Sequence, residues 1–139
     1  LGRLHRGDPD LADHLAGEDL NPGFEDIIAN FSTNYQFYFG FHNNEGVLVD
    51  LIQEAGAKKA AGVIVNGAGF TTTSVAIHDA IKAVRLPVIE VHVTNIFARE
   101  SWRHASVIAM AARATMAGFG IQGYALAIEA LAQMAKTKR

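Results

Sequence analysis

Two ionisable residues, Glu90 and His92, stand two positions apart in the otherwise apolar segment VIEVHV. If this segment is a β-strand, both side chains lie on the same face of it. A buried strand rarely carries Glu and His without partners, because an unpaired buried charge is costly. The pair therefore indicates either a binding site or a structural pair that satisfies itself. A metal site is less favoured, since no third ligand follows at a useful spacing.

A second candidate is the stretch VNGAGFTTTS, residues 65–74. Asn66 ends an apolar segment, and Gly67 and Gly69 could adopt positive φ or let the backbone approach a ligand closely. The helix expected after the stretch begins with free N–H groups, which suit a carboxylate or a phosphate. An ordinary strand-to-helix turn, with Thr73 or Ser74 as the helix cap, explains the same pattern. A nucleotide-binding phosphate loop is excluded, because the Lys after the last Gly is missing.

The third candidate is the charged run ARESWRH, residues 98–104. A run of this kind is solvent-facing by default. Arg103, beside Trp102, could instead close over an anionic or hydroxylated ligand, because its guanidinium offers a rigid fork of donors.

The elements that must position these residues alternate between short apolar strands and amphipathic helices. Strands are expected at residues 35–41, 61–65, 87–93 and 107–112. Helices are expected from Asn21-Pro22 to Asn34, from Asn43 or Asn44 to Gly56, and at 74–84 and 122–136. This alternation predicts an α/β fold with right-handed crossovers and a parallel sheet covered on both faces. Ligands bind such sheets at the carboxyl ends of the strands, where residues 43–46, 66–69 and 92–95 then meet.

Composition limits the classes of function. The chain has 139 residues, a net charge of −2 and no cysteine, which excludes disulfides and thiolate metal sites and favours the cytoplasm. No apolar run reaches the roughly 18 residues that a membrane span needs, and no basic surface with interleaved aromatics suggests nucleic acid. With 50% hydrophobic and only 19% charged residues, the chain is expected to bury contacts with further subunits. We predict no metal and no other cofactor.

Four blocks of the sequence, in order and with equal internal spacing, resemble the type II 3-dehydroquinate dehydratases. These blocks are HNNEGVLVDLIQEA, GVIVNGAGFTTTSVAIHDAI, PVIEVHVTNIFARESWRH and GFGIQGYALAIEAL. The resemblance implies a flavodoxin-like three-layer sandwich, a single domain over residues 1–139, and homo-oligomers built from trimers into a dodecamer. The family's first strand, with its NGPN segment, has no counterpart here, and without it a parallel sheet would lack a central strand.

The resemblance also implies a ligand and the residues that bind it. The family eliminates water from 3-dehydroquinate, a small hydroxylated cyclic carboxylate of the shikimate pathway, through an enolate. Asn66 matches the strand-end Asn that places substrate and water, and Glu90 matches the Glu that supports the site. His92, with the backbone of Val93 and Thr94, matches the stretch that holds the carboxylate. Arg103 matches the Arg that binds the substrate, and Asp79 matches the acid that reaches a neighbouring subunit's pocket.

The family's proton-transfer residues have no match. The His that acts as general acid falls on Thr72, the Tyr that acts as base falls on Ala12, and the Arg beside that Tyr falls on Gly7. Arg6 could partly replace the lost Arg. The sequence therefore predicts a protein that retains the pocket but has weak or no dehydratase activity.

Two alternatives remain open. The chain could be an active dehydratase with substitute proton-transfer residues, for which the candidates are Asp8, Asp10, Asp13, His14 and His104. It could also be an assembly subunit that binds no ligand.

Overall fold

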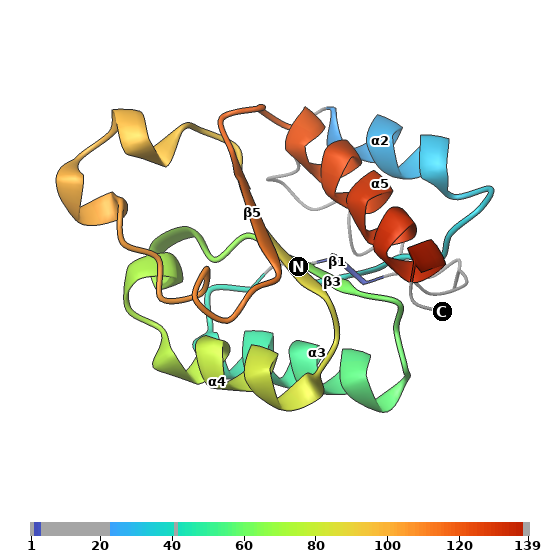
Figure 1. Cartoon of the computed structure of the whole chain (residues 1–139), viewed down its shortest axis with the longest axis horizontal. Coiled ribbons are helices and arrows are strands. Elements are labelled where there is room, and N and C mark those ends of the chain that lie inside the picture. The colour runs from blue at the N-terminus through green and yellow to red at the C-terminus, as the bar shows by residue number, and fades with distance from the viewer. Residues whose placement is uncertain (1, 4–22, 41, 138–139) are drawn as a thin grey trace.

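The computed structural model describes residues 2–3, 23–40 and 42–137, and shows helices on both faces of one sheet (Figure 1). The predicted helix start at Asn21-Pro22 lies outside the described residues. The same holds for Ala12 and Gly7, which occupy the family's base and arginine positions, and for four of the substitute candidates, Asp8, Asp10, Asp13 and His14.

The described part of the sheet has the strand order β2-β1-β3-β4-β5. Its strands are β1 (Gly2–Arg3), β2 (Tyr38–Phe39), β3 (Val63–Val65), β4 (Val88–His92) and β5 (Ala114–Ala117). The last three are parallel to one another, in agreement with the predicted α/β sheet. The short strand β1 lies between β2 and β3 and runs antiparallel to both.

Two helices cover each face of the sheet, which gives three layers (Figure 1). On one face α3 (Glu45–Ala57) packs against α4 (Val75–Val84), and on the other α2 (Phe24–Phe31) packs against α5 (Gln122–Thr137). Side chains of β3 alternate between the layers, so that Val63 and Val65 join the α3–α4 core while Ile64 joins the α2–α5 core. Burying one such side chain contributes roughly 1.5–3 kcal/mol, so the apolar strands hold the three layers together.

The helix starts follow local capping chemistry. Asn44 Oδ1 accepts hydrogen bonds from the N–H groups of Gly46 (2.8 Å) and Val47 (3.3 Å) at the start of α3. Ser74 Oγ accepts one from Ile77 N (3.0 Å) at the start of α4. Both are residue types preferred at N-caps, and both caps were among the predicted alternatives.

One predicted strand is wrong. Residues 107–112 form turns instead, in which the N–H groups of Ala111 and Ala112 donate to Ile108 O, and the fully buried Ile108 packs into the α3–α4 core. The strand comes later, at β5, whose residues are only partly buried or exposed and so give a weaker hydrophobic signal. A short apolar run does not by itself distinguish a strand from a buried turn. The strand expected at 35–41 is present only as β2.

Candidate functional site

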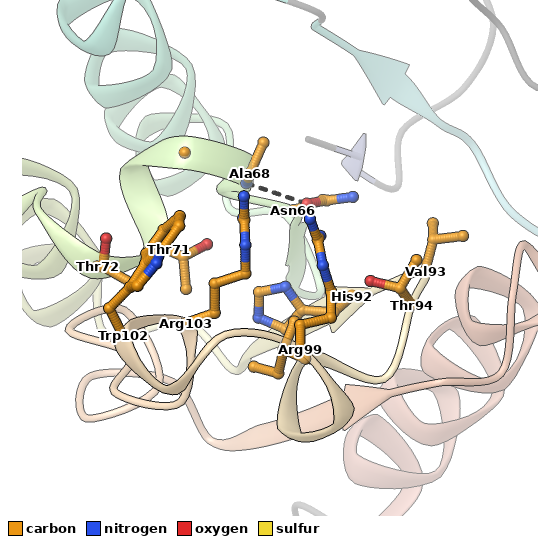
Figure 2. Close-up of a pocket in the computed structure, with 12 residues that line it drawn as sticks. Asn66, Ala68, Thr71, Thr72, His92, Val93, Thr94, Arg99, Trp102 and Arg103 are labelled. Carbon is orange, nitrogen blue, oxygen red and sulfur yellow. Dashed lines mark hydrogen bonds between the residues drawn. The ribbon is translucent and has the colours of Figure 1, made fainter.

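The loops that follow β3 and β4 enclose a pocket of about 220 Å³ at the carboxyl ends of these parallel strands (Figure 2). The first loop contributes Asn66, Ala68, Gly69, Thr71 and Thr72. The end of β4 and the residues after it contribute His92, Val93, Thr94 and Ile96. The charged run contributes Arg99, Trp102 and Arg103. The topology therefore brings together the three candidate segments 65–74, 88–93 and 98–104, whereas residues 43–46, expected at the same edge, contribute no lining residue.

Asn66 is held at both ends of its side-chain amide. Its Oδ1 accepts a hydrogen bond from Ala68 N (3.1 Å), and its Nδ2 donates one to the phenolic oxygen of Tyr124 (2.9 Å). The positive φ expected at Gly67 or Gly69 falls instead on Ala68, at 47°. Gly67 has an ordinary φ of −77°, but a Cβ there would lie 2.5 Å from Ile108 Cδ1, so close packing accounts for this glycine.

Glu90 and His92 lie on the same face of β4, as the spacing predicts. Glu90 is fully buried and accepts hydrogen bonds from Ser106 Oγ (2.6 Å) and Thr115 Oγ1 (3.2 Å). His92 Nε2 lies 3.0 Å from Glu90 Oε1 but does not meet hydrogen-bond geometry, so it has no hydrogen-bond partner among the described residues. Only His92 reaches the pocket, and Glu90 lies behind it.

The charged run is not simply solvent-facing, because Arg99 and Arg103 both extend into the pocket (Figure 2). Arg103 stacks over the ring of Trp102, with Cζ 4.2 Å from the ring centroid. One carboxylate serves both arginines: Glu100 Oε2 lies 2.9 Å from Arg103 Nε and 3.7 Å from Arg99 Nε. Backbone hydrogen bonding, followed by the hydrogen bond from Arg103, lowers the pKa of Glu100. Two cations sharing one carboxylate leave an excess of positive charge at the pocket.

The remaining predicted residues divide into two groups. Thr72, Val93 and Thr94 line the pocket. Asp79 lies outside it, with a 73% exposed side chain whose carboxylate is 3.1 Å from His78 Nδ1. His104, a substitute candidate for proton transfer, hydrogen-bonds Arg99 O (3.1 Å) and is not among the lining residues.

Sequence reasoning did not single out several residues at or beside the pocket. They include Tyr124, in the closing helix, and Arg99 and Thr71, in the two loops. The spacing of Arg99 and Arg103 is not a helical signal, because Arg99 and Glu100 have extended backbone between the short turns Ile96–Ala98 and Ser101–Arg103. The contact of Tyr124 with Asn66 spans 58 positions and has no local signal.

Two further features concern the described residues only. No helix among them is long and apolar enough to cross a membrane. Within the same part of the chain, no group of three or more His, Asp or Glu side chains could hold a metal ion.

These features define an α/β protein with a cationic pocket at the carboxyl edge of its parallel strands. Residues 3–132 match the family model described as dehydroquinase class II. The chain belongs to this family.

Named relatives and solved structures agree with this assignment. The chain is 58% identical to 3-dehydroquinate dehydratase 1 of Bradyrhizobium diazoefficiens, over 95% of this chain and 84% of that protein. It is 48% identical to the 3-dehydroquinate dehydratase of Afipia carboxidovorans, over 95% and 86%. The crystal structure of the type II dehydroquinase from Butyrivibrio crossotus superposes with a TM-score of 0.77 at 33% identity, covering 84% of this chain and 82% of that one.

Proposed function

We propose that the pocket binds a small hydroxylated cyclic carboxylate of the 3-dehydroquinate type, and that the chain dehydrates it weakly or not at all. The observation that carries the proposal is a contrast between two kinds of residue in the pocket, those that bind the ligand and those that transfer protons. The cationic and imidazole groups suited to a carboxylate are retained, while Thr72 stands where the family has its acidic His.

The proposed binding roles follow from charge and position. His92 and the backbone N–H groups of Val93 and Thr94 bind the carboxylate at the end of β4, and Arg103 adds a forked donor. Glu90 orients His92 from behind. Asn66, whose amide is already fixed at both ends, uses its remaining hydrogen and lone pair to place the ligand and a water molecule.

The proposed loss of activity follows from the magnitude of proton transfer. A positioned general acid or base contributes roughly 10²- to 10⁴-fold each. The Thr72 hydroxyl has no pKa near neutrality with which to replace an imidazole, and Ala12 has no ionisable group at all. Without these two groups, only substrate binding and electrostatic placement contribute to catalysis.

The second candidate function is an active 3-dehydroquinate dehydratase. The observation in its favour is the 48–58% identity to proteins that bear this name. It requires that other residues transfer the protons. Asp8, Asp10, Asp13 and His14 remain candidates on sequence grounds, and His104 is less favoured because its ring already binds Arg99 O.

One assay separates the two functions. The purified protein is mixed with 3-dehydroquinate, and the conjugated enone of the product is followed by its ultraviolet absorbance beside a type II dehydroquinase as reference. We expect turnover at least about 10²-fold below the reference, since one missing acid alone accounts for that loss. Turnover within a few-fold of the reference would reject the proposal in favour of the active enzyme.

A repaired variant provides the complementary test. Combining Gly7→Arg, Ala12→Tyr and Thr72→His should raise turnover, because the binding half of the pocket is retained. A variant with Thr73→His in place of Thr72→His is the matched control, since Thr73 is exposed and does not line the pocket. No gain over this control would mean that the pocket itself no longer accepts the substrate.

Assembly and location belong to the same proposal. We infer a homo-oligomer of trimers, in which the exposed Asp79 reaches a neighbouring subunit's pocket, and a cytoplasmic protein as the lack of cysteine suggests. Sedimentation analysis of the wild type and of Asp79→Ala tests the assembly. A stable monomer with full ligand binding would contradict it.

A further inference from the structure

The hydroxyl of Thr71 is the feature of the pocket that the proposed function does not use. The side chain is only 4% exposed and lines the pocket. Its Oγ1 has no hydrogen-bond partner among the described residues. Buried hydroxyls in folded proteins are almost always hydrogen-bonded, so an unpaired one calls for an explanation.

Three neighbouring hydroxyl groups, unlike that of Thr71, form hydrogen bonds that stabilise the fold. Ser74 Oγ donates to Glu45 Oε1 (2.6 Å), and the hydroxyls of Ser106 and Thr115 donate to Glu90. Each of these hydroxyls is tied to a carboxylate of another element. Thr71 is held instead through its backbone, whose carbonyl accepts from Val107 N (2.9 Å). The loop is therefore fixed without help from the Thr71 hydroxyl.

The direction of the side chain adds a second observation. In Figure 2 the Thr71 hydroxyl points toward the side on which Arg103 and His92 lie, whereas Thr72 stands at the outer end of the loop beside Trp102. His92 is 6% exposed, and its Nε2 is the other buried side-chain atom of the pocket without a hydrogen-bond partner among the described residues. Two side chains from different loops therefore line one small cavity, and each carries a buried polar atom that has no hydrogen-bond partner among the described residues.

We infer that Thr71 is a specificity-determining residue: its hydroxyl hydrogen-bonds an alcohol or carbonyl oxygen on the ring of the bound acid. The inference rests on the proposed function, because it adds a ring-oxygen contact to the carboxylate contacts described above. The hydroxyl can donate to a carbonyl and can either donate to or accept from an alcohol. A cyclic acid without oxygen substituents would leave Thr71 unpaired, and a site that binds a polar group discriminates against ligands that lack it.

The test uses Thr71→Val, which replaces the hydroxyl by a methyl group of nearly the same shape. Quinate, a hydroxylated cyclic carboxylate, is the probe, and its affinity is measured by calorimetry. We expect Thr71→Val to bind quinate about tenfold more weakly, which is the loss of one hydrogen bond. Thr71→Ser, which keeps the hydroxyl, should stay within about threefold of the wild type by the same reasoning. Thr73→Val in the same loop is the matched control, because Thr73 does not line the pocket.

A melting temperature without ligand distinguishes recognition from a structural role. Removing an unpaired buried hydroxyl should leave the melting temperature of Thr71→Val unchanged or raise it. A fall of several degrees with unchanged quinate affinity would overturn the inference, since the hydroxyl would then have a partner within the fold. Equal quinate binding by the wild type and Thr71→Val would overturn it as well.

The same experiment separates this inference from the proposed function. If the wild type itself binds neither quinate nor 3-dehydroquinate, the proposed function fails and the role of Thr71 fails with it. If the wild type binds and only the Thr71→Val result departs from expectation, the inference alone fails. Cyclohexanecarboxylate, which has no hydroxyl, should bind the wild type and Thr71→Val equally.

Discussion

Asn66 Nδ2 donates a 2.9 Å hydrogen bond to the phenolic oxygen of Tyr124, and so joins the end of β3 to the closing helix α5. Because Asn66 Oδ1 accepts from Ala68 N, the amide has a defined orientation at the mouth of the pocket. Tyr124 itself packs edge-on against Phe24 of α2, at 5.0 Å between ring centroids. A residue of the α2–α5 layer therefore positions a residue of the candidate site.

Tyr124→Phe removes the partner of Asn66 Nδ2 and keeps the ring. Leaving a partly buried donor unpaired should lower the free energy of unfolding by about 1–3 kcal/mol. Urea denaturation measures the loss. Tyr35→Phe is the matched control, because it removes the same group from a partly buried ring away from the pocket. A Tyr124→Phe loss no larger than that of the control would contradict the structural role of this bond.

The same tyrosine predicts a pH dependence of stability. Burial raises the pKa of Tyr124 above its ordinary value of 10.0, against the smaller opposing effect of the Asn66 hydrogen bond. Between the two pKa values the folded state binds more protons than the unfolded state, so stability falls as pH rises. The contribution is present below pH 10.0 and is lost as pH passes through the folded pKa.

The measurement compares wild type and Tyr124→Phe by urea denaturation between about pH 9 and pH 11, which brackets this transition. The wild type should lose stability more steeply, and subtraction removes the titration of lysines and other tyrosines. Parallel curves would mean that Tyr124 ionises in the folded protein as readily as in water. The raised pKa also makes Tyr124 unsuitable as a substitute for the family's tyrosine base, which must lose its proton near neutrality.

Glu90→Gln tests the buried carboxylate behind His92. Both Glu90 oxygens accept from hydroxyl groups, and a glutamine would present an amide N–H₂ to one of these donors. We expect the free energy of unfolding to fall by about 1–3 kcal/mol. The exposed Glu129→Gln is the control and should change it by less than about 0.5 kcal/mol. A gain in stability would show that desolvation of the carboxylate outweighs its contacts.

Ser74 and Glu45 are expected to act as a coupled pair. Ser74 Oγ caps α4 and donates to Glu45 in the first turn of α3, which ties the two helices together beside the pocket loop. Ser74→Ala should cost about 1–2 kcal/mol, as for other lost N-caps. A cycle with Glu45→Gln and the double variant should give a coupling energy of at least about 0.5 kcal/mol. Additive losses would mean that the 2.6 Å contact contributes nothing beyond the cap.

Arg103→Ala tests the cationic side of the pocket. If Arg103 binds the ligand carboxylate, its loss should weaken quinate binding about tenfold to hundredfold, the value of one charge-assisted hydrogen bond. The salt dependence of binding should also become shallower. Arg113→Ala removes an equal charge outside this pocket and is the control. Equal effects of the two variants on quinate binding would indicate that the overall positive potential of the protein attracts the ligand, and not a direct contact with Arg103.

Short stretches of consecutive residues were sufficient to predict many of the strands and helix starts. The apolar run around Ile64 and the run containing Glu90 and His92 became parallel neighbours, β3 and β4. Asn44 and Ser74 cap the helices that follow their loops. These features depend on a few consecutive residues, whose side-chain alternation and capping hydrogen bonds are the same in any tertiary context. The convergence of the loops at one edge then followed from the handedness of parallel crossovers.

Tertiary structure decided what stands in the pocket. The strand β5 formed at residues 114–117 rather than 107–112, because Ile108 found a place in the α3–α4 core. Contacts between loops that are distant in sequence brought Arg99 and Thr71 to the same cavity. Tyr124 reached Asn66 across 58 positions. Sequence patterns report which neighbours along the chain share a face, whereas these contacts depend on how whole elements pack, which no local pattern encodes.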